Sequence, residues 1–138
     1  MIAFVAVASP LIVFASSIPG MPDQRGVSSL QLGLSLIWTE VRHRGIPLEQ
    51  ILWWMAAKPA QLAGLGNKGR LALGYDADLA VFAPDEAYVV DASKLKHRNP
   101  ITPYDGKALS GVVRQTYLRG TLIDGRTPAG KLIRRGSA

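Results

Sequence analysis

The sequence predicts an α/β chain in which helices come first and short strands follow. Apolar residues recur at helical spacing through residues 30–55, and from Gly66 onward Gly and Pro divide the chain into apolar runs of strand length. A length of 138 residues, with 48% hydrophobic and 19% charged residues, is sufficient for one folded core. We therefore expect a folded module without internal repeats.

The first predicted helix covers residues 30–41. Its apolar residues lie on one helical face, since they are spaced i, i+4, i+7, i+8 and i+11: Leu30, Leu34, Ile37, Trp38 and Val41. Ser28 or Ser29 can cap the start of this helix. Gly45 can end it, because glycine readily adopts the left-handed conformation that terminates helices.

A second helix is predicted to begin at Pro47, which suits a position in the first turn. Its apolar residues also repeat at helical spacing, at Leu48, Ile51, Leu52 and Met55. We expect Lys58 and Pro59 to interrupt this helix, and residues 59–65 to form a separate helical turn closed by Gly64 or Gly66.

The later part of the chain is predicted to be β-rich. The runs of strand length are residues 71–73, 79–82, 88–90, 112–118 and 121–123. Arg119-Gly120 lies between the last two runs and predicts a hairpin turn. From Arg126 onward the chain has little to bury, so we expect residues 126–138 to form a flexible tail.

The stretch Met1–Ser17 is almost wholly apolar. A signal peptide would require a basic start, whereas the first cationic residue is Arg25. A membrane helix needs about 20 apolar residues, and Pro10 breaks this shorter run. We therefore favour a buried strand followed by a loop, and leave export or membrane insertion as alternatives.

Composition limits the classes of function. The absence of cysteine excludes disulfides, thiolate metal sites and cysteine nucleophiles, and it agrees with a cytoplasmic setting. The net charge of +6 is spread along the chain without an aromatic-interleaved basic motif, so we do not expect nucleic-acid binding.

Few residues are candidates for chemistry. The two histidines, His43 and His97, lie 54 positions apart between cationic neighbours, which is a poor pattern for a metal site. Asp76 and Asp78 precede a strand within a turn-like sequence, and this setting favours a structural role. No serine has the Gly-x-Ser-x-Gly context of a nucleophile. We therefore predict no catalytic residue and no metal ligand in this chain.

Two longer stretches carry recognisable motifs. The first, Lys58–Phe82, includes Lys-Pro-Ala-Gln-Leu-Ala-Gly-Leu-Gly and Gly-Tyr-Asp-Ala-Asp-Leu, and the second is Lys96–Gly106 followed by Gly111–Gly120. Together they resemble the C-terminal part of the cyclic amidohydrolases, the family of dihydropyrimidinase, hydantoinase and allantoinase. The second stretch is similar to allantoinases in particular, as are Ser28–Leu34 and Trp38–Glu40. The resemblance covers residues 26–123.

The resemblance implies a fold and a domain division. Residues 1–65, of which 1–25 diverge, would form the last helices of a (β/α)₈ metal-dependent hydrolase barrel, and residues 66–125 would belong to its small accessory β-sandwich. A complete barrel needs roughly 250 residues, so any barrel in this chain must be partial. The expected fold is thus an α/β fragment of such a hydrolase.

The resemblance also implies an activity, hydrolysis of the small molecule allantoin to allantoate in purine catabolism. In the family a metal-activated water attacks a ring amide, at a binuclear centre expected to hold zinc, in a homo-oligomeric enzyme. The family's metal ligands are a His-x-His pair, a bridging lysine, two further histidines and an aspartate, and Val7 falls where the aspartate is expected. Of a Trp-Gly-Gly substrate-binding segment only Gly26 remains.

The expectation from the sequence is therefore a truncated allantoinase-like chain that is inactive alone. The alternative is a non-catalytic interaction module, an inactive partner of a full-length amidohydrolase. Export or membrane attachment is the third alternative.

Overall fold

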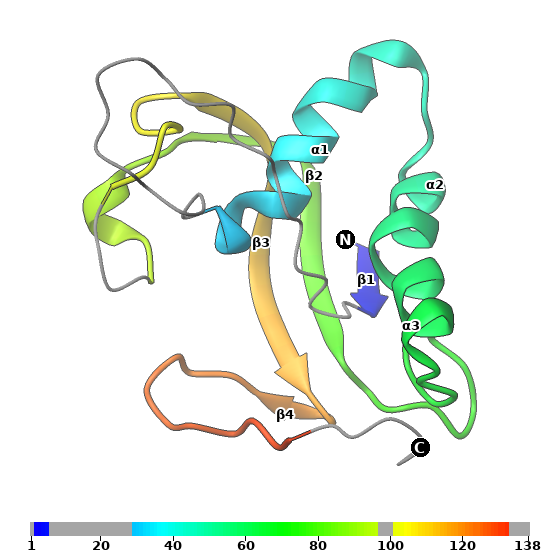
Figure 1. Ribbon diagram of the computed structural model, residues 1–138. Helices are drawn as coiled ribbons and strands as arrows, with labels where there is room; N and C mark the ends of the chain where they lie inside the picture. The colour runs from blue at the N-terminus through cyan, green and yellow to red at the C-terminus, as the bar shows by residue number, and fades with distance from the viewer. Residues whose placement is uncertain (1, 6–28, 97–100, 133–138) are drawn as a thin grey trace.

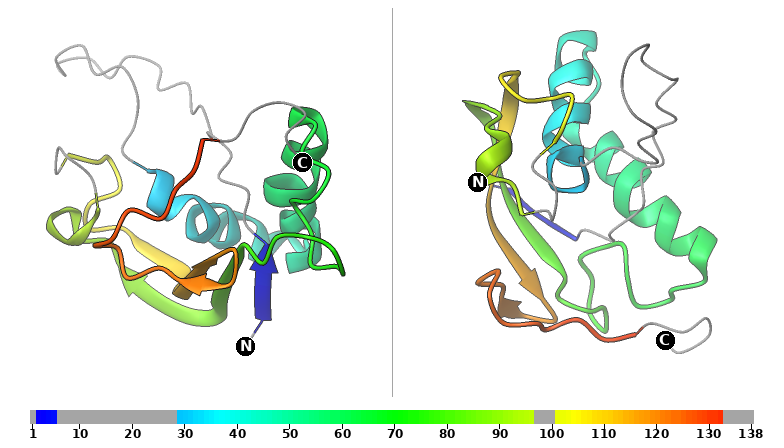
Figure 2. Two further views of the ribbon diagram at one scale, coloured as in Figure 1. Left: turned by 90° about the horizontal axis from the view of Figure 1, so that it is seen from below. Right: turned by 60° about the vertical axis from the view of Figure 1, so that its left-hand side comes forward.

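The computed structural model describes residues 2–5, 29–96 and 101–132. Within these ranges helices pack on one face of an antiparallel sheet (Figures 1 and 2). The helices come first in the chain and the long strands follow, as the sequence predicts. The sheet also contains a strand from the start of the sequence, β1 (Ile2–Val5), as predicted, whereas Pro10 and the predicted loop after the strand lie outside the described residues.

The first predicted helix is confirmed. A 3₁₀ turn, η1 (Leu30–Leu32), leads into α1 (Gly33–Val41), and a second 3₁₀ turn, η2 (Arg42–Arg44), follows. Gly45 ends this run in the left-handed conformation, with φ of 67°. Ser29 occupies the N-cap position, but its side chain makes no capping hydrogen bond to the helix.

The predicted break at Lys58-Pro59 is wrong. The segments α2 (Leu48–Leu52), η3 (Trp53–Ala57) and α3 (Lys58–Ala63) follow one another without a break, and Pro47 is the N-cap residue instead of lying in the first turn. The η3 segment is a π-helix, in which the N–H of Lys58 donates to the Trp53 carbonyl. This wider turn lies directly before Pro59, where a proline ring would clash with the carbonyl of an ordinary α-helical turn. We call the continuous element the α2–α3 helix.

The sheet has the order β1-β2-β3-β4, and all neighbouring strands are antiparallel. The predicted run 79–82 and residues 88–89 of the run 88–90 belong to one strand, β2 (Leu79–Val89), and the run 112–118 lies within β3 (Ala108–Leu118). An irregularity between Ala83 and Ala87 bends β2. Such a bulge adds unpaired residues to one strand, and it explains why the sequence pattern is interrupted there.

The predicted hairpin turn at Arg119-Gly120 is confirmed, and β4 (Thr121–Leu122) follows it. Both residues have positive φ, 48° for Arg119 and 77° for Gly120, which is the pattern of a type I′ turn. The predicted strand at residues 71–73 is wrong, because this run lies in a loop. Leu71 and Leu73 are 70% and 102% exposed, so no sheet neighbour covers them.

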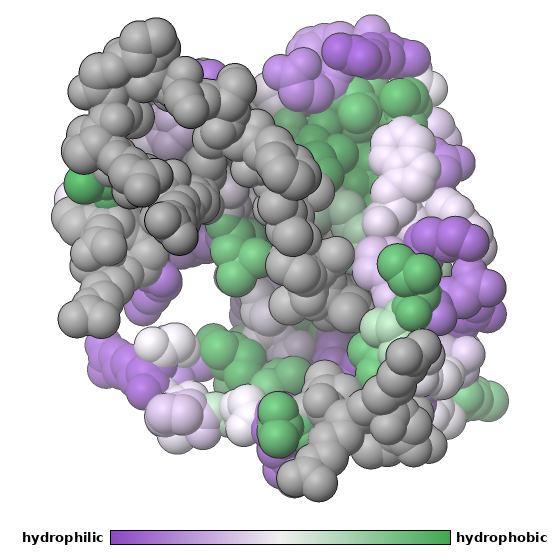
Figure 3. Space-filling model, viewed as in Figure 1, coloured by the Kyte–Doolittle hydropathy of each residue, from purple (hydrophilic) through white to green (hydrophobic). Residues whose placement is uncertain are grey.

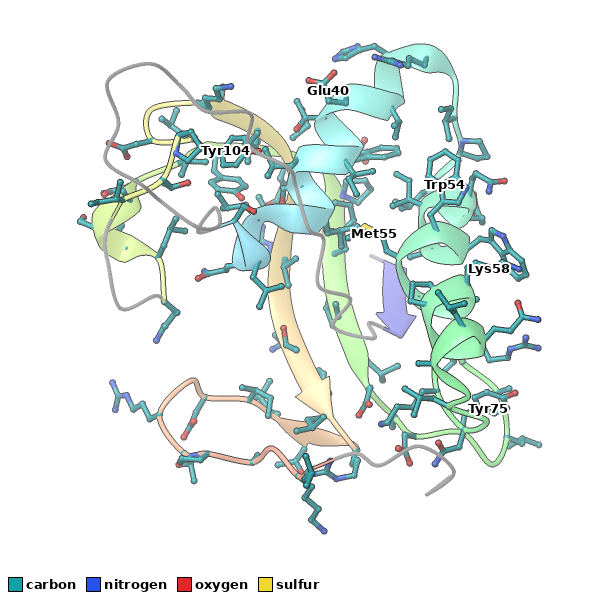
Figure 4. All side chains as sticks on the ribbon, in the orientation of Figure 1. Glu40, Trp54, Met55, Lys58, Tyr75 and Tyr104 are labelled. Carbon is teal, nitrogen blue, oxygen red and sulfur yellow. The ribbon has the colours of Figure 1, made fainter. Side chains whose placement is uncertain are left out.

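Two apolar clusters connect the helices to the sheet. The first is built around Leu48, Ile51 and Phe82, with Met55 directed from the α2–α3 helix toward the sheet (Figure 4). The second contains Leu32, Val90 and Leu109. Tyr104 packs against the second cluster from the loop before β3, near the start of α1 (Figure 4). Leucine, isoleucine and phenylalanine side chains of this kind contribute most of the burial that stabilises a small module.

Candidate functional site

Polar side chains of α1 fasten this helix to the bent part of the sheet. The Ser35 hydroxyl donates to the Gly111 carbonyl at 2.7 Å, and the indole N–H of Trp38 donates to the Pro84 carbonyl at 2.9 Å. The Thr39 hydroxyl oxygen accepts the N–H of Ser110 at 2.8 Å. These bonds satisfy backbone groups where the bulge leaves the strand ladder irregular, so α1 fixes the bend of the sheet.

Gly111 lies at the centre of this contact. Its φ is +85°, and a Cβ atom there would meet the Phe82 ring and lie 2.8 Å from Cδ1 of Trp38. Trp38 and Phe82 pack edge to face, with ring centroids 6.5 Å apart. Any side chain at this position would therefore force apart the two aromatic rings that join helix and sheet.

A second polar cluster joins the loop after α3 to the sheet. The Lys68 ammonium lies 2.6 Å from a carboxylate oxygen of Asp76 and 2.5 Å from one of Asp78. The other Asp78 oxygen accepts the backbone N–H of Arg119 at 2.8 Å. The side chains of Lys68 and Asp78 are only 8% and 9% exposed. We call these three side chains the Lys68 cluster: Lys68, Asp76 and Asp78.

The electrostatics of the Lys68 cluster favour the charged lysine. Burial of the ammonium acts to lower the pKa of Lys68, but hydrogen bonds and charges from Asp76 and Asp78 outweigh it and raise the pKa above 10.5. One buried cation is thus matched by two carboxylates and further hydrogen bonds, the condition under which a buried ion pair is tolerated. The predicted structural role of Asp76 and Asp78 is confirmed.

The described residues do not fit the binuclear metal centre that the resemblance implies. Across residues 2–5, 29–96 and 101–132, no three His, Asp or Glu side chains gather closely enough to hold a metal ion. The carboxylates of Asp76 and Asp78 both bind Lys68. His43 lies exposed in η2, as predicted for a surface imidazole. Val7, Gly26 and His97 lie outside the described residues.

The same described ranges contain no helix that is long and apolar enough to cross a membrane.

The sequence reasoning missed the polar contacts of Ser35, Thr39 and Lys68. Ser35 and Thr39 are spaced i, i+4 and lie beside Trp38 on the predicted helix, which was an available signal. Polar residues next to the apolar face of a helix commonly form hydrogen bonds to the element on which that face packs. Lys68 had no comparable signal, since its partners depend on how the loop folds back.

The chain is similar to allantoinases across most of its length. It is 53% identical to the allantoinase of Streptomyces avermitilis over 114 residues, which cover 80% of this chain and 26% of that protein. It is 40% identical to the allantoinase of Arabidopsis thaliana over 102 residues, which cover 72% of this chain and 20% of the relative. The chain thus spans about a quarter or less of the length of these relatives.

Solved structures with a similar fold include two hydantoinases. The D-hydantoinase (dihydropyrimidinase) from Thermus sp. matches with a TM-score of 0.72 and 26% identity, over 81% of this chain and 26% of the other. The L-hydantoinase (dihydropyrimidinase) from Arthrobacter aurescens matches with a TM-score of 0.66 and 30% identity, over 80% of this chain and 24% of the other. The model of the amidohydrolase family matches residues 39–127, more than half of the chain. This chain, an α/β portion built like part of a cyclic-amide hydrolase, belongs to the amidohydrolase family.

Proposed function

We propose that this chain supplies the carboxyl-terminal portion of an allantoinase-type enzyme, one that opens the ring of allantoin to give allantoate. The observation that carries the proposal is the 53% identity to the Streptomyces avermitilis allantoinase, which exceeds the 26–30% identity to the hydantoinases. The difference favours allantoin over the substrates of the hydantoinases. A cytoplasmic, homo-oligomeric enzyme is part of the same proposal.

In this proposal the chain contains two structural parts of the enzyme. Residues 1–65 contribute the last helices of the (β/α)₈ barrel, residues 66–125 contribute strands of the accessory β-sandwich, and residues 126–138 form the tail. The order of elements supports this division, since α1 and the α2–α3 helix precede the long strands β2 and β3. The strand β1 pairs with β2, so the first part also contributes to the sheet of the second.

The chain's own residues would have a scaffolding role. In enzymes of this kind the metal supplies an activated water. The described residues do not fit a metal centre, so the ligands of the metal would come from outside them. Ser35, Trp38 and Gly111 hold α1 on the sheet, and the Lys68 cluster holds the loop after α3. Gly26 is the one position proposed to approach substrate. With two histidines where the family's centre uses four, the chain alone is expected to be inactive.

The proposal is tested with a chimaera in which residues 29–132 replace the matching segment of the Streptomyces avermitilis allantoinase. A folded chimaera should hydrolyse allantoin, whereas the isolated chain should show no turnover with added divalent metal. Turnover by the isolated chain, or a folded chimaera without activity, would contradict it. The intact Streptomyces enzyme provides the reference rate.

A second function is favoured by the large apolar side chains that the described residues expose, such as Leu62 and Leu73. Under this alternative the chain is a non-catalytic module that binds a complete amidohydrolase subunit through an apolar surface. Co-purification with intact allantoinase in a defined stoichiometry would support this function. A lack of association at micromolar concentrations would argue against it.

A further inference from the structure

Large apolar side chains are exposed along one stretch of the described chain. Its helical part carries Trp53 and Trp54, 46% and 45% exposed, and Leu62, 84% exposed. The loop that follows carries Leu71 and Leu73, 70% and 102% exposed. Figure 4 shows Trp54 on the outer surface of the α2–α3 helix, and Figure 3 shows neutral and apolar side chains on that side of the molecule with hydrophilic ones between them. We call these five residues the helix–loop face.

The helical part of this face depends on the π turn. Trp54 and Leu62 are eight residues apart, which corresponds to one wide π turn followed by one α-helical turn, so both lie on a similar side of the helix. The Lys58 ammonium lies 5.8 Å from the centre of the Trp53 ring, and Lys58 comes midway between Trp54 and Leu62 in the sequence, so a cation lies within this face. The turn that accommodates Pro59 thus also sets the direction of the two tryptophans.

The loop part is held in place at both ends. Before the leucines, Gly69 passes so close to the helix that a Cβ there would lie 2.6 Å from Cβ of Ala60. After them, the N–H of Asp76 donates to the Asn67 carbonyl at 2.9 Å, and the Asp76 carboxylate binds Lys68. A loop fixed in this way presents Leu71 and Leu73 in a defined position, which reduces the entropy lost on binding.

Scattered exposed leucines are normal on protein surfaces, but a tryptophan pair together with three leucines on one helix and the loop after it has the composition of an interface core. Tryptophan is among the residues that contribute most to binding energy at such interfaces. The relatives provide a matching partner, because about three quarters of the Streptomyces avermitilis allantoinase lies outside the segment that this chain matches.

We propose that the helix–loop face packs against that remaining part of an allantoinase-type enzyme and is buried there. This inference rests on the proposed function for the identity of the partner. The contact covers Trp53, Trp54 and the loop leucines, and the Lys58 cation, held over the Trp53 ring, lies among them. The Lys68 cluster then acts at a distance, by keeping the loop in the position that the partner requires.

Residue-resolved hydroxyl-radical labelling, read by mass spectrometry, tests this inference on the isolated chain and on the chimaera. In the isolated chain the five residues should be labelled strongly. In the chimaera their labelling should fall to the level of Leu32 and Ile51, which are 1% and 0% exposed, whereas Leu122 on β4 should remain labelled. Unchanged labelling of the face in the chimaera would overturn the inference, as would a chimaera labelled throughout because it does not fold.

Paired substitutions give a second readout that does not depend on activity. Leu71→Asp with Leu73→Asp should leave the unfolding midpoint of the isolated chain unchanged, since both side chains are exposed there, and should lower the midpoint of the chimaera. Leu122→Asp is the matched control on a different surface. Equal effects of the paired substitution in the two proteins would contradict the inference. A folded, inactive chimaera with a protected face would instead contradict only the proposed function.

Discussion

Replacing Gly111 with alanine should remove a large part of the stability of the chain. Gly111 has φ of +85°, and a left-handed conformation costs an alanine about 1–2 kcal/mol. The new Cβ would also lie 2.7 Å from Cε2 of Phe82, which is fully buried. Forcing an extra carbon into a packed core costs about 1–3 kcal/mol. The expected loss is therefore about 2–5 kcal/mol, against a total stability of about 5–15 kcal/mol for an ordinary domain.

The assay is urea unfolding of the full chain, followed by tryptophan fluorescence and far-ultraviolet circular dichroism. Gly74→Ala is a close control, because its φ is +83° and the alanine Cβ would have no neighbouring atom within 4 Å. Both variants carry the same backbone strain, so the difference between their unfolding free energies isolates the clash with Phe82 and Trp38. If Gly111→Ala and Gly74→Ala lose the same stability, the reasoning about this contact is refuted.

Three further predictions use the same unfolding measurement. Lys68→Met should lower the free energy of unfolding by about 3–5 kcal/mol, because it leaves the carboxylate of Asp78 buried without its cation. Arg44→Met is the control, and it should change stability by less than about 0.5 kcal/mol because Arg44 and its partner Glu40 are both exposed. Similar small losses for both variants would contradict this prediction. Because the pKa of Lys68 in the folded state is raised above 10.5, the stability from its charge is fully present below pH 10.5 and is lost as pH rises through the folded pKa. Above pH 10.5 the wild-type chain should therefore lose stability faster than Lys68→Met. Parallel pH profiles of the two proteins would refute the assignment. Trp38→Phe should cost about 1 kcal/mol or somewhat more, because it removes the hydrogen bond to the Pro84 carbonyl and some packing; no change would show that this bond contributes nothing.

Much of the helical region could be predicted from the sequence because its signals are local. The apolar spacing of residues 30–41 and the glycine at position 45 specify where the first helix runs and ends, and the structure agrees. Arg119-Gly120 predicted a tight turn correctly because two-residue hairpin loops need positive φ, which glycine adopts readily.

The errors arose where a distant contact overrides a local signal. Pro59 usually marks a helix boundary, yet the π turn before it lets the α2–α3 helix continue while its buried face packs on the sheet. Residues 71–73 have the composition of a strand, but the Lys68 cluster and the close approach of Gly69 to Ala60 hold them in a loop. Neither effect has a signature within a short window of sequence.

The candidate site likewise combines local signals with distant contacts. The structural role of Asp76 and Asp78 followed from their turn-like sequence, but their partners Lys68 and Arg119 come from elsewhere in the fold. The allantoinase resemblance came from long sequence motifs, whereas no group of metal ligands is found among the residues that the structure describes.

The most direct test of the central claim is the rate of allantoin hydrolysis by the folded chimaera that carries residues 29–132, measured beside the isolated chain with zinc present. We expect turnover by the chimaera and none by the isolated chain. Allantoin hydrolysis by the isolated chain, or a folded chimaera that leaves allantoin intact, would contradict the account.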